Sequence, residues 1–421
     1  MRRLSATTVS YGIEFFADIG FHAMVTVVAV YYVQTVGLNP LELVLLGTVF
    51  EVTIFLFEVP TGVIADTYSR RASVILGFAL EGIAGILIGL FPSYPVIVAA
   101  CVVWGIGATC MSGAYEAWIA DEVGPARATR VFLRNAQFAY AGAIVGALLG
   151  VAVATVDLGA AVVVGGAVTL ATAFACVFVM PETGFTRKPA AERLGALWDV
   201  KATAVAGTRL IRAERLLLLI VAITFFFGMA AEGLDRLWEA HLIRDVGLPS
   251  LGGLDPVVWF GVINVVGLSL GIVVTSMLIP RFEHADNTAL ARALLGLTAV
   301  LSTTVALFGL ATGFALAVGV YMLARLGRRM IEPLYLIWLN RNIQDSSVRA
   351  TVISMTNQAG ALGEVGGGPV VGTIGTLVSI RAALVFAGLA LTPAIALYAR
   401  ALRHGGKEPE LEQLPEPAEA M

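Results

Sequence analysis

A short polar segment sets the pattern for the whole chain: residues 62–71 read Gly-Val-Ile-Ala-Asp-Thr-Tyr-Ser-Arg-Arg. Apolar runs of helical length lie on either side of it, at 41–65 and 72–91. A helix needs about 20 residues to cross a hydrocarbon core roughly 30 Å thick. The segment therefore predicts a tight polar turn between two membrane-spanning helices, and its arginines favour a cytoplasmic position for that turn.

The composition extends this pattern to the rest of the chain. Of 421 residues, 58% are hydrophobic and 14% are charged, with a mean hydropathy of +0.86, whereas a soluble domain carries about 25% charged residues. These values exclude an ordinary soluble enzyme, and the net charge of −3 gives no reason to expect a nucleic-acid partner. The three cysteines lie inside apolar runs and the four histidines are scattered. We therefore expect no disulfide framework, no metal site and no cofactor.

Twelve apolar stretches are long enough to cross a membrane. They cover residues 9–35, 41–65, 72–91, 95–119, 131–156, 159–180, 216–242, 256–280, 288–311, 313–339, 351–376 and 380–402. Most of the 27 Lys and Arg residues fall in the N-terminus, in alternate connections or in the C-terminal tail. Because basic residues are retained in the cytoplasm, we predict an all-α, multi-pass protein of the cell membrane with both termini cytoplasmic.

The first and second halves of the sequence resemble each other. At one constant offset, Arg127-Ala128-Thr129 corresponds to Arg349-Ala350-Thr351, Asn135 to Asn357, Gly146 to Gly368 and Gly150 to Gly372. Likewise, Val36-Gly37-Leu38 recurs as Val246-Gly247-Leu248. A repeated six-span unit predicts two pseudo-symmetric six-helix halves with a binding site at their interface. The alternative is chance similarity among Gly- and Ala-rich helices.

The predicted domain limits follow from this duplication. We expect an N-terminal six-helix bundle at 1–183, a cytoplasmic linker at 184–214, a C-terminal six-helix bundle at 215–403 and a disordered cytoplasmic tail at 404–421.

Residues 62–71 resemble the G-x-x-x-D-x-x-x-R-[RK] signature of the major facilitator superfamily. The resemblance implies a twelve-helix transporter whose cytoplasmic loop forms a conformational gate. In that gate Gly62 would allow close approach of another helix, and Asp66 would occupy a helix N-terminus. Arg70 and Arg71 would pair with an acid such as Asp121. The alternative is a simple basic membrane anchor.

Other motifs are similar to those of the tetracycline- and macrolide-efflux branch, which are drug:proton antiporters. They are Glu58-x-Pro60-Thr61-Gly62 and residues 117–122, which read Ala-Trp-Ile-Ala-Asp-Glu. Glycines spaced by four resemble an antiporter motif without its proline: Gly142, Gly146 and Gly150, with Gly368 and Gly372 in the second half. Plain helix packing explains them equally well. Cys101 occupies the position at which exporters of this family often carry an arginine.

Ionisable residues inside the spans are candidate functional groups, because each costs roughly 2.5–3.5 kcal/mol to insert at the bilayer centre. Glu14, Asp18 and His22 share one helix face at i, i+4 and i+8. A carboxylate in a partly dry site can exchange a proton near neutral pH, so this column predicts a proton path or a cation site. Structural hydrogen bonds are the alternative.

In the family that the sequence resembles, the cavity is lined by spans 1, 4, 7 and 10. This favours as proton-coupling or substrate residues Glu14, Asp18, His22, Glu116, Glu232, Asp235 and Arg325, to which Glu364 of span 11 is added. Glu81 belongs to a peripheral span and is discounted, and Glu239 is expected at a solvated rim. Arg328 and Glu332 could neutralise each other locally, whereas Arg325 and Arg329 need partners on other helices.

The sequence therefore predicts a secondary active transporter that exports amphipathic drugs or metabolites in exchange for protons, as in multidrug and antibiotic resistance. Its expected partners are a small-molecule substrate, protons and the lipid bilayer, and the chain is expected to act as a monomer. No Walker motif points to ATP, and no catalytic arrangement points to an enzyme. The alternatives are an uptake symporter or facilitator for a nutrient, organic anion or lipid, and a non-transporting sensor.

Overall fold

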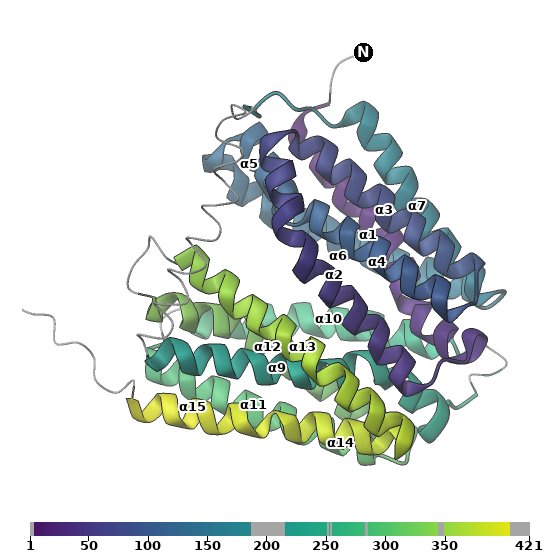
Figure 1. Ribbon diagram of the computed structural model, residues 1–421, viewed down its shortest axis with the longest axis vertical. Helices are drawn as coiled ribbons and strands as arrows, with labels where there is room; N and C mark the ends of the chain where they lie inside the picture. Colours follow the sequence, from purple (N-terminus) through teal and green to yellow (C-terminus); the bar gives the residue numbers. More distant parts are fainter. Residues whose placement is uncertain are drawn as a thin grey trace, which may run out of the picture.

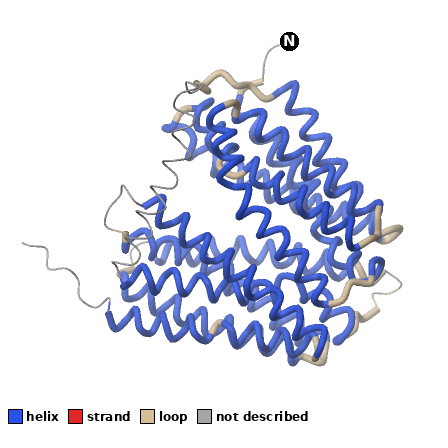
Figure 2. The backbone as a smooth tube through the Cα atoms, in the orientation of Figure 1, coloured by secondary structure: helices blue, strands red, loops and turns tan. Residues whose placement is uncertain are grey.

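The computed structural model describes residues 4–186, 215–250, 252, 255–282, 285–343 and 349–404. Most of the predicted linker and nearly all of the predicted tail lie outside these residues. All regular structure in the described ranges is helical (Figure 2).

The helices of the first part are α1 (Ala6–Tyr31), a π-helical turn η1 (Tyr32–Val36), α2 (Pro40–Thr67), α3 (Arg70–Leu90), α4 (Tyr94–Met111), α5 (Ala114–Val123), α6 (Pro125–Ala154) and α7 (Leu158–Val179). Those of the second part are α9 (Arg215–His241), a π-helical turn η2 (Leu242–Val246), α10 (Val258–Phe282), α11 (Asn287–Leu310), α12 (Phe314–Asn342), α13 (Arg349–Leu377), α14 (Ile380–Ala390) and α15 (Thr392–His404).

Local sequence explains where these helices begin and end. Asn39 and Glu42 form a capping box at the start of α2, with reciprocal hydrogen bonds of 2.9 and 3.0 Å, which satisfies two otherwise free N–H groups. The repeated Val-Gly-Leu sequences end η1 and η2. In both, the glycine takes a positive φ, 75° at Gly37 and 82° at Gly247, which L-residues with a side chain rarely adopt.

Among the residues that the structure describes, ten helical segments are long and apolar enough to cross a membrane. The predicted spans 10 and 11 coincide with α12 and α13, which are not among these ten. Four charged residues interrupt the middle of α12, and α13 is rich in glycine and carries polar side chains: Arg325, Arg328, Arg329 and Glu332 on α12, and Asn357, Gln358 and Glu364 on α13. The predicted span 4 is divided into α4 and α5 at Gly113, which has a φ of 69°.

The helices gather in two groups (Figure 1). α1 packs against α6 and α7, and α3 against α4 and α7, whereas α9 packs against α13 and α14, and α11 against α12 and α14. Between the groups, α2 contacts α13 and α9, and α10 contacts α6. At the start of α2 the contact is tight, because the Leu41 N–H donates to Thr376 Oγ1 of α13 at 2.9 Å.

Glycine permits the closest helix contacts. On α6, a Cβ at Gly146 would lie 2.9 Å from the Cα of Ile19, and Gly142 and Gly150 similarly face α1. On α13, Gly368 and Gly372 instead face α2, at Val44 and Leu41. The two predicted glycine sets therefore serve different contacts: α6 packs within its own group, and α13 packs between the groups.

Gly62 lies near the other end of α2 and has no atom within 4 Å of the place where a Cβ would stand. The close helix approach predicted there is absent from this conformation. The physical reason is the divergence of α2 and α13 from their contact near Leu41 toward Gly62 (Figure 1).

Candidate functional site

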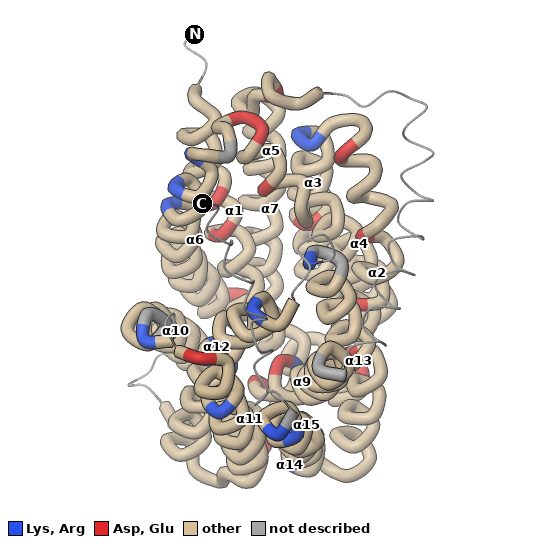
Figure 3. Tube along the Cα trace, turned by 90° about the vertical axis from the view of Figure 1, so that its left-hand side faces the viewer, with Lys and Arg blue, Asp and Glu red and all other residues tan. Residues whose placement is uncertain are grey.

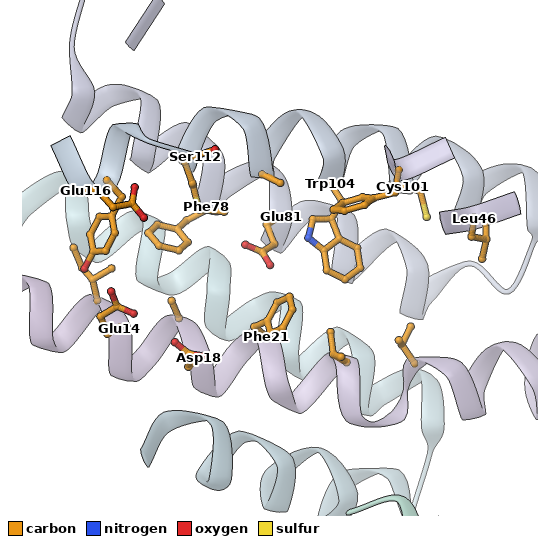
Figure 4. A pocket seen from close by; sticks show the side chains of 18 of the residues that line it. Glu14, Asp18, Phe21, Leu46, Phe78, Glu81, Cys101, Trp104, Ser112 and Glu116 are labelled. Atoms are coloured by element: carbon orange, nitrogen blue, oxygen red, sulfur yellow. The ribbon is translucent and has the colours of Figure 1, made fainter. Parts of the chain in front are cut away.

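A cavity of about 620 Å³, here called the acidic cavity, lies among α1 to α5. Four carboxylates line it: Glu14 and Asp18 from α1, Glu81 from α3, and Glu116 from α5. Figure 4 shows the two α1 acids on one wall and the other two on the opposite wall. The cavity therefore has negative groups on both sides, and Arg236 of α9 is the basic residue in its lining.

Neighbouring side chains hold the two acids of α1. Asn135 of α6 donates from Nδ2 to Glu14 Oε1 at 3.3 Å, and Ser10 donates to Asn135 Oδ1 at 3.2 Å. Asp18 Oδ1 lies 3.4 Å from His22 Nδ1. Glu14 and Asp18 face the acidic cavity, whereas His22 lines a different one. The predicted column of three residues thus connects two cavities across α1.

Aromatic rings form much of the remaining wall of the acidic cavity. Trp104 of α4 makes edge contacts with Phe21 and Phe50, at centroid distances of 6.2 and 5.7 Å, and its indole nitrogen faces the Glu81 carboxylate (Figure 4). Aromatic faces together with carboxylates suit a cation that also carries an apolar body.

A second cavity of about 360 Å³, here called the arginine cavity, lies between α1, α9, α10 and α12. Its charged lining residues are His22, Asp235, Glu239, Arg325, Arg328, Arg329 and Glu332. Arg328 Nη1 lies 2.6 Å from both carboxylate oxygens of Asp235, so it pairs across helices and not with Glu332 on its own helix. Arg325 donates to Asn264 Oδ1 of α10 at 2.9 Å.

Glu239 does not lie at the solvated rim expected for it. Its side chain is 7% exposed, and its Oε2 atom has no hydrogen-bond partner. The position near the end of α9 suggested solvent, but Trp238 and Tyr321 cover this region with rings stacked 4.5 Å apart.

A third cavity of about 520 Å³, here called the α13 cavity, lies between α2, α9, α12 and α13. Glu51 of α2 and Glu364 of α13 both line it, close enough to share a hydrogen bond. Asn357 is also in this lining, while Asn135, its counterpart in the sequence repeat, binds Glu14. The Glu51–Glu364 contact joins the two groups of helices.

Glu232 does not line any of these three cavities. It is 3% exposed and lies 3.7 Å from the Arg236 guanidinium. Gly47 of α2 leaves space for both side chains, because a Cβ there would stand 2.6 Å from Glu232 Oε2. The pair is therefore part of the contact between α9 and α2.

The polar turn predicted from residues 62–71 is held by several ion pairs and hydrogen bonds. The Arg70 guanidinium forms a close ion pair with Asp121 of α5 and lies 3.2 Å from Asp66 of α2. Arg71 instead donates to the Val177 carbonyl of α7 at 2.5 Å. Glu182 accepts from the Arg71 N–H at 3.0 Å. The cluster therefore joins α2, α3, α5 and α7.

The site residues predicted from the sequence do not include three acids that the fold brings to the cavities: Glu51, Glu81 and Glu239. All three are visible in the sequence as carboxylates inside apolar runs, but the sequence alone offered no reason to select them. Glu81 was discounted because the family resemblance assigns its span to the periphery, yet it is 5% exposed and lines the acidic cavity. Within the described ranges, no group of three or more His, Cys, Asp or Glu is placed to hold a metal ion.

Comparisons with known proteins agree with this architecture. Residues 11–367 match the sequence profile of the Major Facilitator Superfamily. The uncharacterized MFS-type transporter YxaM of Bacillus subtilis (strain 168) is 23% identical over 363 residues, which cover 85% of this chain and 86% of that protein.

Solved structures of transporters share the fold at low sequence identity. A peptide transporter POT in complex with sulfate has a TM-score of 0.74 at 15% identity and covers 95% of both chains. A variant of the nucleoside transporter NupG has a TM-score of 0.76 at 11% identity, over 96% of this chain and 100% of that one. A bacterial homolog of the human lysosomal transporter Spinster, inward-facing and unoccupied, has a TM-score of 0.69 at 16% identity, over 94% and 96%. This chain is a multi-pass membrane protein that belongs to the major facilitator superfamily.

Proposed function

We propose that the protein is a proton-coupled transporter that exports amphipathic, cationic drugs or metabolites by alternating access. The observation that carries this proposal is the acidic cavity, in which four carboxylates face each other across an aromatic lining. A cation with an apolar body would replace water in such a site and compensate its negative charge.

The proposed topology has twelve spans in two six-helix halves, 1–183 and 215–403. In it α12 and α13 are the remaining two spans, because their charged residues line cavities and are not required to face lipid. Lys and Arg residues on several helices lie on the side of the molecule that Figure 3 shows, which supports cytoplasmic termini. In the sequence, Arg127, Arg130 and Arg134 begin α6, and Arg281 ends α10.

The proposed transport cycle rocks the two halves about the acidic and arginine cavities. In the conformation described here, α2 and α13 touch at Leu41 and Gly372 and diverge toward Gly62. In the proposed topology this conformation is open to the cytoplasm. Closing it would bring another helix onto the free surface at Gly62 and would strain the Arg70–Asp121 ion pair.

Protons are proposed to enter this cycle at two places. The Asp18–His22 contact links the acidic cavity to the arginine cavity, so a proton taken up there would change the charge that both cavities present. The Glu51–Glu364 contact joins the two halves. Two ionised carboxylates in contact repel each other, so one shared proton would favour the closed contact between α2 and α13.

The test uses purified protein in liposomes with an imposed pH gradient and follows a cationic dye. Native protein is expected to move the dye against its concentration gradient, and Asp18→Asn is expected to abolish gradient-driven movement. Glu58→Gln is the matched control, because it also neutralises a membrane acid, but one that is exposed on α2 and does not line the three cavities. If the native protein moves the dye at the same rate with and without the pH gradient, proton coupling is refuted.

The direction of transport is tested separately, in inverted membrane vesicles. Export predicts dye accumulation inside these vesicles, since their cytoplasmic face is outside. Accumulation only in right-side-out vesicles would establish uptake. Dye binding without flux in either orientation would favour a sensor.

An organic-anion transporter is the second candidate function, and the arginine cavity favours it. Arg325 and Arg329 have no carboxylate within ion-pair distance in the described part of the chain, so they could receive an anionic substrate. This function predicts that the native protein transports an aromatic carboxylate and does not transport the cationic dye. It also predicts that Arg329→Gln abolishes transport of the carboxylate.

A further inference from the structure

The arginine cavity contains charged groups of both signs that do not pair with one another. Arg325 and Arg329 have no acid within 4 Å among the residues that the structure describes. Glu239 lines the same cavity with a carboxylate that is 7% exposed and whose Oε2 atom lacks a hydrogen-bond partner. A buried carboxylate without a partner is unfavourable, and the two guanidinium groups, which are partly exposed, also lack a carboxylate. Each of the three groups can therefore bind a ligand group of opposite charge.

The neighbouring acids do not form ion pairs with Arg325 or Arg329. Asp235 is engaged by Arg328 at 2.6 Å, and Glu332 lies exposed on α12. Arg325 donates to one neutral oxygen, that of Asn264. Its guanidinium, with five N–H groups, retains donors that match a carboxylate.

Glycine on α10 leaves the space in which the two guanidinium groups lie. A Cβ at Gly267 would stand 3.2 Å from Arg325 Nη1, and a Cβ at Gly271 would stand 2.9 Å from Arg329 Cδ. Because Arg325 and Arg329 are four residues apart, they lie on the same face of α12. They therefore form one cationic surface along α10.

Part of the remaining wall is apolar. Trp238 and Tyr321 stack at 4.5 Å with their rings inclined by 13°, and Val25, Leu234 and Leu268 also line the cavity, together with the polar residues His22 and Thr26. A volume of about 360 Å³ accommodates a small molecule the size of an apolar amino acid or somewhat larger.

We infer that the arginine cavity binds a zwitterion with an aliphatic or aromatic body, whose carboxylate contacts Arg325 and Arg329 and whose ammonium contacts Glu239. One such molecule would pair all three unmatched groups, which neither a simple cation nor a simple anion can do. The inference goes beyond the proposed function, because it concerns a ligand of the arginine cavity and not the cation proposed for the acidic cavity.

The test compares L-phenylalanine with two derivatives that each lack one charge, N-acetyl-L-phenylalanine and L-phenylalanine methyl ester. Binding to the purified full-length protein in detergent is measured by titration calorimetry without a pH gradient. The zwitterion is expected to bind at least about 10-fold more tightly than either derivative, because each derivative loses one charge-assisted contact. This comparison on the native chain does not depend on the folding of any variant.

Three variants assign the two ends of the ligand. Glu239→Gln is expected to remove the preference for the zwitterion over the N-acetyl compound and to keep its preference over the ester. Arg329→Gln is expected to do the reverse. Arg292→Gln is the matched control, because it removes an exposed guanidinium on α11 outside the arginine cavity and should leave all three affinities unchanged.

The inference is overturned if L-phenylalanine does not bind, if either derivative binds as tightly, or if both site variants weaken all three ligands equally. Its failure is distinguishable from failure of the proposed function. Cation movement driven by the pH gradient and lost in Asp18→Asn would persist if only the zwitterion site were wrong. Binding selectivity measured without a gradient would persist if only the coupling were wrong.

Discussion

Arg328 of α12 lies 2.6 Å from both carboxylate oxygens of Asp235 on α9, and this ion pair separates the arginine cavity from the α13 cavity. Arg328 lines both cavities, whereas Asp235 lines the first. The pair thereby neutralises the charge of one of the three guanidinium groups in the arginine cavity. The charges of Arg325 and Arg329 are not neutralised in this way.

The ion pair is expected to make a modest contribution to stability. Its side chains are 41% and 45% exposed, so water screens their attraction, and a coupling energy of about 1 kcal/mol is expected. A double-mutant cycle with Arg328→Gln and Asp235→Asn, followed by thermal unfolding in detergent, measures this coupling. Strictly additive effects would show that the pair is not energetically coupled.

Glu239→Gln is expected to leave the stability of the empty protein unchanged or to raise it by about 1–3 kcal/mol. The substitution keeps the shape of the side chain and removes a buried charge whose Oε2 atom has no partner. Thermal unfolding of the purified protein in detergent checks this. A large loss of stability would mean that the carboxylate has a structural partner.

Gly146→Ala is expected to destabilise the protein by about 1–3 kcal/mol through overpacking. The added Cβ would lie 2.9 Å from the Cα of Ile19 on α1, and backbone cannot move aside as a flexible side chain can. Gly296→Ala on α11 is the matched control, because no atom lies within 4 Å of its Cβ position. It should be neutral or slightly stabilising, since alanine favours helix over glycine. Equal effects of the two substitutions would contradict close packing at Gly146.

Arg70→Lys is expected to impair transport nearly as much as Arg70→Gln. Arg70 pairs with Asp66 and Asp121 and also donates to the Ala117 carbonyl at 3.1 Å, and a compact ammonium cannot reproduce the guanidinium geometry. Transport assays in liposomes, with thermal unfolding as a check on folding, measure the effect. Full activity of Arg70→Lys would indicate that the cluster acts only as a basic membrane anchor.

A disulfide between Leu41→Cys on α2 and Gly372→Cys on α13 is expected to stop transport when oxidised and to restore it when reduced. A Cβ at Gly372 would lie 2.9 Å from the Cα of Leu41, so the two residues are within reach of a disulfide once α2 and α13 separate slightly to admit the new side chain. The three native cysteines are buried, so they are not expected to react with the oxidant. Unimpaired transport by the oxidised protein would exclude separation of these helices during the cycle.

Much of the fold follows from the sequence because backbone N–H and C=O groups in the bilayer must be hydrogen-bonded within the protein. A run of about 20 apolar residues must become a helix to satisfy its backbone in the bilayer. The polar turn at residues 62–71 and the Val-Gly-Leu repeats likewise follow from local chemistry, since Ser69 caps α3 and Gly37 and Gly247 adopt positive φ. The predicted Arg70–Asp121 pairing is also present, although the two residues lie 51 positions apart in the chain.

The partners of buried charges could not be read from the sequence, because they depend on how distant helices pack. Nothing in the spacing of α12 shows that Arg328 turns to Asp235 and not to Glu332 four residues away. Glu81 occurs in a span that looks peripheral, and only the crossing of α3 and α4 places it opposite Asp18.

The sequence by itself determined the membrane class, the helical segments, the polar turn and the superfamily, because each depends on hydropathy or on residues close together in the chain. Tertiary structure alone decided the three cavities and which charges share them. It divided Glu14, Asp18 and His22 between two cavities and enclosed Glu232 with Arg236. It also placed Glu239 in one cavity with Arg325 and Arg329, which have no acid within 4 Å in the described part of the chain. The reason is physical: the environment of a charge is set by the helices packed around it, and these come from parts of the chain far apart in sequence.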